Sequence, residues 1–282
     1  MRLGIKNRIL LYTLYLYRNT LPPDLYKLYK SLLKKYQMYK NALIKISNLL
    51  NKYRIKYAII KSIRPYPVTT VDIDILLFLD YDDLIELNRI LTESGYRFFA
   101  SGPQSITYLD PNNDISIDFY INHVTSSRIV YLNGKIAEKY INKINYLNNT
   151  MYTLDPCLEV SLVAGHSVYK EQMVTLSDIL ITIDRMKKCK DATVGLTKAA
   201  NMTYNSYPIS YILSIIYKFI NKEYLCLPIK LSVGDIIRAF YNKINDKCFL
   251  KSLLWQTIYL TNYNRLKTFI LYLREHAFRE TY

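Results

Sequence analysis

The chain has 282 residues, of which half are hydrophobic, 14% are aromatic and 22% are charged. This composition, with its 29 tyrosines, argues against a disordered chain and supplies enough apolar surface for one large core or two smaller ones. Seven glycines are present, and none lies in a dinucleotide-binding or P-loop fingerprint, which excludes those two classes of nucleotide-binding protein.

The net charge of +15 is distributed unevenly along the sequence. Residues 1–64 hold 15 Lys and Arg against one acidic residue, residues 65–120 hold two against ten, and residues 121–282 hold 21 against 12. Basic flanks around an acidic centre can hold a polyanion, either nucleic acid or the triphosphate of a nucleotide. A codon bias toward Lys, Tyr, Ile and Asn, with lysines on solvated helix faces, explains the same pattern without a function.

The cysteines and the apolar runs indicate the compartment. The four cysteines form no CxxC pair and no Cys/His cluster at zinc-ligand spacing, so we expect buried thiols in a reducing compartment. The apolar runs Ile9–Tyr17 and Tyr207–Ile220 are too short to span a bilayer. We therefore expect a soluble, cytoplasmic protein that does not interact with membranes.

The N-terminal segment is predicted to be helical. Residues 1–20 predict a short helix, Pro22 and Pro23 break it, and a long amphipathic helix is expected to begin near Asp24. Apolar residues recur at steps of three and four and predict one buried face: Leu25, Leu28, Leu32, Tyr36, Tyr39, Leu43, Ile46 and Leu50. The tyrosines could also stack on bases, but packing in the core is the commoner role at this spacing.

From residue 57 the period changes to that of strands. The expected elements are a buried strand at Tyr57–Ile60, a proline-containing loop at Lys61–Thr70, a strand at Val71–Leu79, a helix at Tyr81–Ser94 ended by Gly95, a strand at Tyr96–Ala100, and a hairpin of Gln104–Leu109 with Asp114–Ile121. This order predicts a mixed α/β core.

After about residue 134 the chain is expected to be helical again, with helices from Asp155 to Gln172, at Leu176–Lys188, and at residues 207–222, 232–245 and 250–279. The predicted fold class is therefore α+β. Its expected parts are a basic N-terminal helical arm (1–50), a small mixed-sheet core (51–150) and a C-terminal helical domain (151–282).

Two of the predicted strands carry carboxylates at alternate positions. Asp72 and Asp74 share one face of the first, with Val71, Ile73 and Ile75 on the other, and Asp114, Ser116 and Asp118 share one face of the second. If the strands are neighbours, Asp72, Asp74 and Asp118 converge, and such a cluster needs cations, for which oxygen ligands favour Mg²⁺ or Mn²⁺. The alternative is a half-exposed sheet with a polar outer face.

These residues resemble the signature of the polymerase-β-type nucleotidyltransferases. In that superfamily a strand ends in Gly-Gly or Gly-Ser and an Asp-x-Asp follows some ten residues later; here the corresponding segments are Tyr57–Ser62 and Asp72–Leu77. The sequence is most similar to an uncharacterised branch in which Leu-Lys-Gly precedes a tyrosine/proline loop. The resemblance continues through Gly95-Tyr96, Ile117-Asp118-Phe119, His166, Lys170 and Asp178, and it covers about residues 50–190.

The resemblance implies metal-assisted nucleotidyl transfer from a nucleoside triphosphate such as ATP. Asp72, Asp74 and Asp118 would be the catalytic metal ligands for two Mg²⁺ ions, with Mn²⁺ as a substitute. The expected nucleotide-binding residues are Lys61, Ser62, Arg64, Lys170 and His166. Here Lys61-Ser62 departs from the glycine-containing pattern: Ser62 would replace glycine with its hydroxyl and N–H, and Lys61 would supply charge. His166 has a structural alternative as a core residue, and Asp178 is expected to be a structural helix partner.

The acceptor is not specified by these motifs. The basic flanks favour RNA, and toxin-type relatives that modify tRNA add the hypothesis of a toxin–antitoxin system with a protein partner. The same chemistry on a protein or a small molecule is a second possibility. A third is a degenerate, non-catalytic module that binds nucleic acid, which Lys61 in place of glycine supports and three intact carboxylates oppose.

Overall fold

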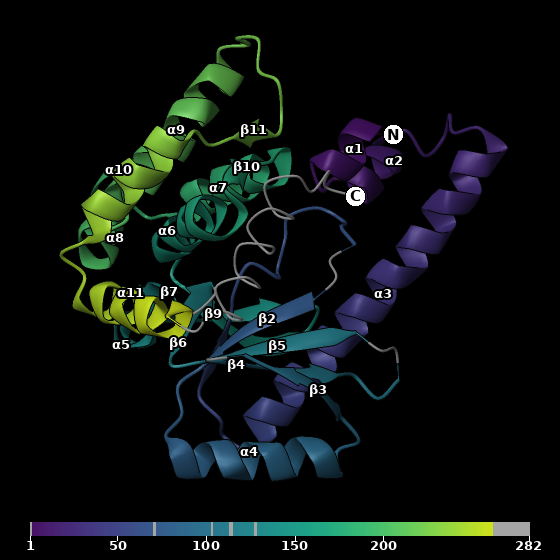
Figure 1. Ribbon diagram of the computed structural model, residues 1–282. Helices are drawn as coiled ribbons and strands as arrows, with labels where there is room; N and C mark the ends of the chain where they lie inside the picture. Colours follow the sequence, from purple (N-terminus) through teal and green to yellow (C-terminus); the bar gives the residue numbers. More distant parts are fainter. Residues whose placement is uncertain (1, 70–71, 103, 113–114, 127–128, 262–282) are drawn as a thin grey trace. The chain divides into compact units, whose positions relative to one another are not determined.

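The computed structural model describes residues 2–69, 72–102, 104–112, 115–126 and 129–261 (Figure 1). Val71, Asp114 and the end of the last predicted helix lie outside these residues. Contacts between residues divide the chain into two units. We call Leu10–Val124 with Gly134–Asp155 the sheet unit, and Met1–Ile9 with Thr125–Asn133 and Pro156–Tyr282 the helical unit.

The sheet unit is built on a seven-stranded mixed sheet, in the order β3-β4-β5-β2-β1-β9-β8. The strands are β1 (Tyr57–Ile59), β2 (Asp72–Leu77), β3 (Arg97–Ser101), β4 (Ser105–Leu109), β5 (Ser116–Ile121), β8 (Ile141–Tyr146) and β9 (Asn149–Leu154). The pairs β2–β5 and β1–β9 are parallel, and the other neighbours are antiparallel. A mixed sheet beside many helices confirms the α+β class.

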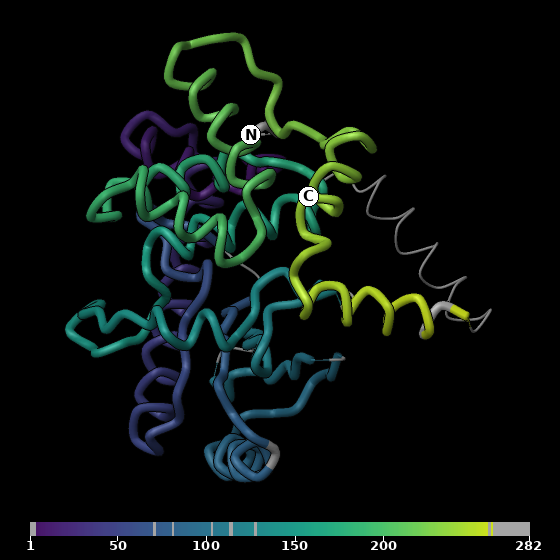
Figure 2. The backbone as a smooth tube through the Cα atoms, turned by 90° about the vertical axis from the view of Figure 1, so that its left-hand side faces the viewer, coloured from purple at the N-terminus to yellow at the C-terminus, as the bar shows by residue number. Residues whose placement is uncertain are grey.

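Two helices cover one face of this sheet. They are α3 (Pro23–Lys52), with Asp24 in its first turn, and α4 (Tyr81–Glu93), which is followed by Gly95 at φ +84° as expected for a helix end. Both contribute to one core with alternate residues of the strands, among them Ile73, Ile75, Ile117 and Phe119. Figure 1 shows α3 crossing the direction of β2 and β5, and Figure 2 shows α4 end-on below the rest of the sheet unit. The opposite face of β2 and β5 carries the acidic residues.

The predicted apolar stripe of α3 is confirmed, although it serves two clusters. Residues from Tyr39 to Leu50 belong to the core under the sheet. Residues from Leu25 to Tyr36 pack against Leu11 and Leu14 of α2 (Leu10–Leu16) and against Tyr29. Its tyrosines at positions 36 and 39 therefore contribute to packing, which supports the core interpretation for these two.

The prediction of helix directly after residue 134 was wrong for residues 141–154. A four-residue helix, α5 (Gly134–Ala137), and a 3₁₀ turn, Glu138–Tyr140, are followed by the β8–β9 hairpin, which joins the sheet through β1. Leu147 and Asn148 both have positive φ, as a two-residue primed hairpin turn requires. Isoleucines three residues apart in β8 imitate a helical period, so the sequence pattern misled the interpretation.

The helical unit contains most of the remaining elements. They are α1 (Arg2–Lys6), β7 (Ile129–Asn133), α6 (Pro156–Gly165), a π-helical turn (His166–Glu171), β10 (Met173–Val174), α7 (Leu176–Lys188), α8 (Ala192–Thr203), α9 (Ser206–Ile220), β11 (Ile229–Lys230), α10 (Val233–Lys243) and α11 (Lys247–Leu260). In β6 (His123–Ser126), which pairs with β7, the chain passes from one unit to the other. The sequence interpretation missed α8 and all of these short strands.

An ion pair lies in the interior of the helical unit. The Arg185 guanidinium on α7 donates from Nε to Glu159 Oε2 on α6 at 2.6 Å, and both residues are at most 5% exposed. Arg185 also pairs with its neighbour Asp184, which Lys188 contacts at 2.8 Å. The two central helices of the unit are thus joined by a buried charge pair.

Two of the cysteines are not free thiols. Cys157 at the start of α6 and Cys189 at the end of α7 form a disulfide with a Cα–Cα distance of 5.6 Å. The expectation of four thiols was wrong here because the packing of α6 on α7 brings together positions 32 residues apart. Cys226 and Cys248 take no part in this disulfide. Among the described helices, none has both the length and the apolarity needed to cross a membrane.

Candidate active site

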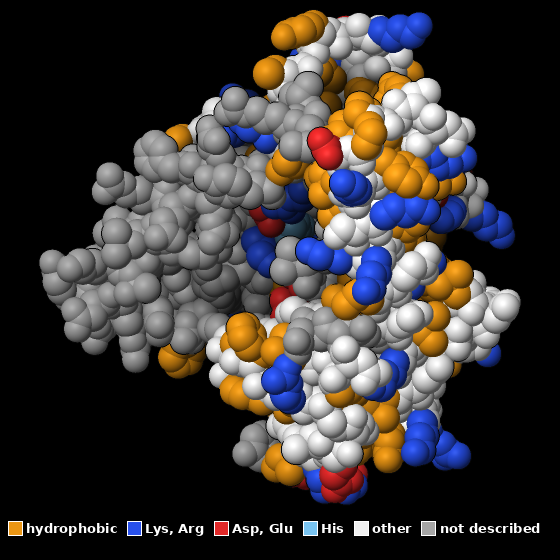
Figure 3. Space-filling view, turned by 90° about the vertical axis from the view of Figure 1, so that its right-hand side faces the viewer, with side chains coloured by type: hydrophobic (Ala, Val, Ile, Leu, Met, Phe, Trp, Pro, Cys, Tyr) orange, Lys and Arg blue, Asp and Glu red, His pale blue; other side chains and the backbone are white. Residues whose placement is uncertain are grey.

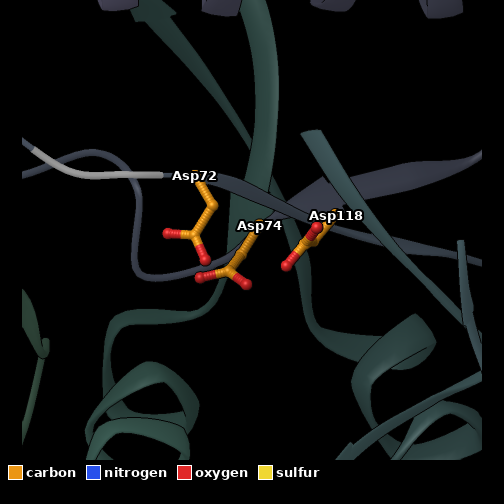
Figure 4. Close-up of side chains that lie close together, drawn as sticks. All are labelled: Asp72, Asp74 and Asp118. Carbon is orange, nitrogen blue, oxygen red and sulfur yellow. The ribbon is translucent and has the colours of Figure 1, made fainter. Parts of the chain in front are cut away.

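Three carboxylates meet on one face of the central strands. β2 and β5 are adjacent and parallel, and their register pairs Asp72 with Ser116 and Asp74 with Asp118. Asp72, Asp74 and Asp118 each offer an oxygen, and these three oxygens lie within 4.8 Å of one another. Figure 4 shows the carboxylates of β2 side by side with that of β5. The convergence that the alternation predicted is confirmed.

The three acidic residues differ in their exposure. Asp74, in the middle of the cluster, is 7% exposed, whereas Asp72 and Asp118 are half-buried. Like charges at this separation raise one another's cost of ionisation, and burial increases that cost. The cluster therefore requires positive charge or hydrogen-bond donors close to it.

Two such groups are supplied by the sheet unit itself. Lys61 Nζ lies 3.0 Å from Asp74 Oδ2, and both side chains are at most 10% exposed. Thr107 on β4, the register partner of Asp118, donates from Oγ1 to Asp118 Oδ1 at 2.7 Å. Sequence reasoning missed Thr107, and it assigned Lys61 to a triphosphate. The alternation of the β4–β5 hairpin was a signal that could have placed Thr107 on the acidic face.

The loop after β1 keeps the backbone shape of a glycine-containing motif without the glycine. Lys61 has φ +58°, in the left-handed region that glycine adopts most easily. Asp74 N donates to Ser62 Oγ at 2.8 Å, and Ser62 Oγ donates to Ile60 O at 3.0 Å. Tyr39 of α3 donates its hydroxyl to Ser62 O at 3.1 Å. The loop is therefore hydrogen-bonded to both α3 and β2, and the hydroxyl proton of Ser62 is donated to a backbone carbonyl of the same loop.

Of the other predicted nucleotide-binding residues, one lies in the same loop and two lie in the helical unit. Arg64 is half-buried in the same loop. His166 and Lys170 belong to the π-helical turn of the helical unit, where His166 is buried and its Nε2 lies 3.5 Å from Glu171 Oε1. Glu171 also accepts from Arg8 Nη2 at 2.6 Å. The approach of His166 and Lys170 to a nucleotide stays a prediction.

Asp178 has the structural role that was expected of it. At the start of α7 it forms a capping box with Thr175: Thr175 Oγ1 accepts from the Asp178 N–H, and the Thr175 N–H donates to the Asp178 carboxylate. The backbone N–H and the side-chain carboxylate of Asp178 thus both stabilise the start of α7.

The donor set of the cluster fits a hard divalent cation. All three candidate ligands are carboxylates, and oxygen donors of this kind suit Mg²⁺ and Mn²⁺ better than the softer metals. Asp72, Asp74 and Asp118 would hold the ions, and Asp74 lies between the other two (Figure 4). The spacing of adjacent strands, about 4.8 Å, is what sets the separation of Asp74 from Asp118.

Comparison with known proteins gives limited likenesses. No family model and no curated protein matches the chain. Three solved structures resemble it in part: the lincosamide antibiotic adenylyltransferase LnuA bound to lincomycin (15% identity, 51% of this chain and 94% of that one, TM-score 0.37), an antigenic nucleotidyltransferase-like protein from Paracoccidioides brasiliensis (13%, 71% and 96%, 0.39), and the STING-associated CdnE c-di-GMP synthase from Capnocytophaga granulosa (13%, 89% and 97%, 0.32). Similarity at this level assigns neither family nor activity.

Proposed function

We propose that the chain is a metal-dependent nucleotidyltransferase, which transfers a nucleoside monophosphate from a nucleoside triphosphate to a hydroxyl group and releases pyrophosphate. The observation that carries the proposal is the meeting of Asp72, Asp74 and Asp118 on adjacent parallel strands, with one carboxylate almost fully buried. Gathering three carboxylates is costly, and Lys61 offsets only one of their charges, so the cluster keeps a negative charge that a divalent cation would balance.

Each residue has a role in this proposal. Asp72 and Asp74 would hold the metal ions, and Asp118 would be a third ligand and would accept the proton of the attacking hydroxyl. When bound, the divalent ions neutralise the triphosphate and stabilise the entering and leaving oxygens. Arg64 and the N–H of Ser62 are the candidate phosphate contacts within the sheet unit. Thr107 orients the Asp118 carboxylate through its hydrogen bond. Much of the acceleration would come from this positioning.

For the acceptor we propose RNA. On α3, Lys27, Lys30, Lys34, Lys35 and Lys52 are exposed, and Asp24 is the acidic residue of the helix. Lysines of this helix lie over tyrosine rings, and Lys30 Nζ, for example, is 5.3 Å from the centre of the Tyr26 ring. Lys and Arg side chains are spread over the face drawn in Figure 3, with few acidic ones among them. Lysines bind phosphates and tyrosine rings can stack on bases, which suits single-stranded RNA.

A non-catalytic nucleic-acid-binding module is the second candidate. The ion pair between Lys61 and Asp74 favours it, because a lysine that permanently neutralises the central carboxylate would remove the need for metal. Such a module would bind RNA with a steep dependence on salt and would bind neither triphosphate nor divalent ions. The intact cluster of three acids favours the enzyme.

The test is transfer of label from each of the four α-³²P-labelled nucleoside triphosphates, in Mg²⁺, to total RNA or to protein. We expect labelled RNA from the wild type and at least about a hundredfold less from Asp72→Asn or Asp118→Asn. The matched control is Asp82→Asn, which removes an exposed carboxylate of the same unit on α4 and should retain the activity.

The possible results separate the candidates. Label in protein with RNA unlabelled would keep the chemistry and change the acceptor. No label from any triphosphate with any acceptor, or equal transfer by Asp72→Asn and the wild type, would refute the enzyme. Salt-dependent RNA binding without transfer would then support the binding module.

A further inference from the structure

The cluster of carboxylates already contains a cation that belongs to the chain. Lys61 Nζ is 3.0 Å from Asp74 Oδ2 and lies 5.9 Å from the centre of the Tyr120 ring, on the strand that carries Asp118. The Lys61 side chain is 9% exposed. An ammonium group buried to this extent needs partners that carry negative charge, and Asp74 is the partner that the structure gives it.

The position of Lys61 is fixed by the loop rather than by chance packing. Its backbone is in the left-handed region, and the flanking residues are bound to their surroundings. Ile60 N donates to Asp74 O at 3.0 Å, and Ser62 accepts from both Asp74 N and the Tyr39 hydroxyl. The same hydrogen bonds that attach the loop to β2 therefore hold the base of the Lys61 side chain beside Asp74.

The charges of the site indicate what this ammonium does. Three ionised carboxylates carry −3, and Lys61 reduces this to −2, which one divalent cation balances. A second divalent cation would bring the group to +2 unless Lys61 moved away or a triphosphate supplied its negative charge. Like charges a few ångströms apart repel strongly at a partly buried site. Lys61 and a metal ion thus compete for Asp74.

On the basis of the proposed function, we infer that Lys61 occupies one of the two cation positions of the acidic cluster. The nucleotide-free protein then binds one divalent ion, and the second enters when Lys61 leaves Asp74. Lys61 is a positioning residue that sets the number and affinity of the metal ions. It keeps the nucleotide-free site stable, because it offsets repulsion that Asp72, Asp74 and Asp118 would otherwise exert on one another.

The experiment measures Mn²⁺ binding without nucleotide, by electron paramagnetic resonance of the free ion and by calorimetry. Lys61→Met keeps the length of the side chain and removes its charge, and Lys61→Arg keeps the charge. The matched control is Lys56→Met, which removes an exposed lysine of the same unit that pairs with the half-buried Glu138 at 2.7 Å. We expect one equivalent of Mn²⁺ in the wild type and in the Arg and Lys56 variants. Lys61→Met should bind two, the first at least about tenfold more tightly.

Thermal unfolding gives a second readout that does not depend on catalysis. Without metal, Lys61→Met should unfold at a lower temperature than the wild type, and Mn²⁺ should raise its unfolding temperature by more. If Lys61→Met does not fold without metal, Lys61→Gln, which can still donate a hydrogen bond to Asp74, replaces it in the same measurements.

Two results would overturn the inference, and they differ in what else they affect. If Lys61→Met binds Mn²⁺ with the number and affinity of the wild type, Lys61 does not compete with metal, whereas the proposed metal-dependent function stands. If neither protein binds Mn²⁺ although both are folded, the inference and the metal dependence of the proposed function fail together.

Discussion

Breaking the buried ion pair of Arg185 and Glu159 should lower the free energy of unfolding of the helical unit by an amount that its geometry allows us to predict. Replacing Arg185 by Met leaves the Glu159 carboxylate, 3% exposed, without the guanidinium that donates to it at 2.6 Å. Removing one partner of a buried ion pair typically costs about 3–5 kcal/mol, because the remaining charge is desolvated and unbalanced. Asp184 keeps Lys188 at 2.8 Å, so most of the cost falls on Glu159.

Urea unfolding measures this cost. Circular dichroism at 222 nm follows both units, and the transition that shifts in Arg185→Met is that of the helical unit, which holds α6 and α7. We expect that transition to lose about 3–5 kcal/mol in Arg185→Met and to recover most of the loss in the double variant with Glu159→Met. A loss below about 1 kcal/mol, or a double variant no more stable than Arg185→Met, would refute the reasoning.

Two further predictions concern tyrosines of the sheet unit. Tyr39→Phe removes the hydrogen bond to Ser62 O, so it should cost about 1–2 kcal/mol in urea unfolding and weaken triphosphate binding measured by calorimetry; unchanged affinity would show that the loop does not depend on this bond. Burial raises the pKa of Tyr57 to about 12. In the unfolded chain Tyr57 ionises near pH 10. The contribution of its protonated side chain to folding stability is therefore complete below pH 10 and is lost as the pH rises toward 12, by about 3 kcal/mol at most. Tyr57→Phe should reduce this alkaline loss of stability, and an identical loss in the variant would contradict it.

Local patterns predicted the elements of the fold whose signals lie within one segment. The apolar stripe of α3 and the alternation in β2 and β5 each depend on neighbouring residues alone, and these elements are confirmed. The β8–β9 hairpin was missed because Ile141 and Ile144 are three residues apart, and pairing with β1 overrides that helical period. Its turn left a signal in Asn148, a residue type that tolerates positive φ.

The candidate site was predictable in part for the same reason. Alternation placed the carboxylates of each strand on one face, and the resemblance suggested that the strands are neighbours. The contact of Lys61 with Asp74 depends on the path of a loop, and that of Thr107 with Asp118 depends on strand register. The path of the loop is not encoded in a short window of sequence, so the contact of Lys61 became visible only in three dimensions. Alternation could place Thr107 on the acidic face, but its pairing with Asp118 required the register of the hairpin.

The in-register pairing of β2 with β5 makes the geometry of the acidic cluster depend on the packing of the hydrophobic core. A shift of β5 by a single position would turn Asp118 toward α3 and α4 and bring Ile117 or Phe119 into its place, because side chains alternate between the two faces. The register of the two strands is therefore fixed by the packing of their apolar residues against the helices, namely Ile73, Ile75, Ile117 and Phe119. Variants that lengthen or shorten either strand by one residue would separate the three carboxylates, and would remove the proposed metal site, while every acidic residue remained in the sequence.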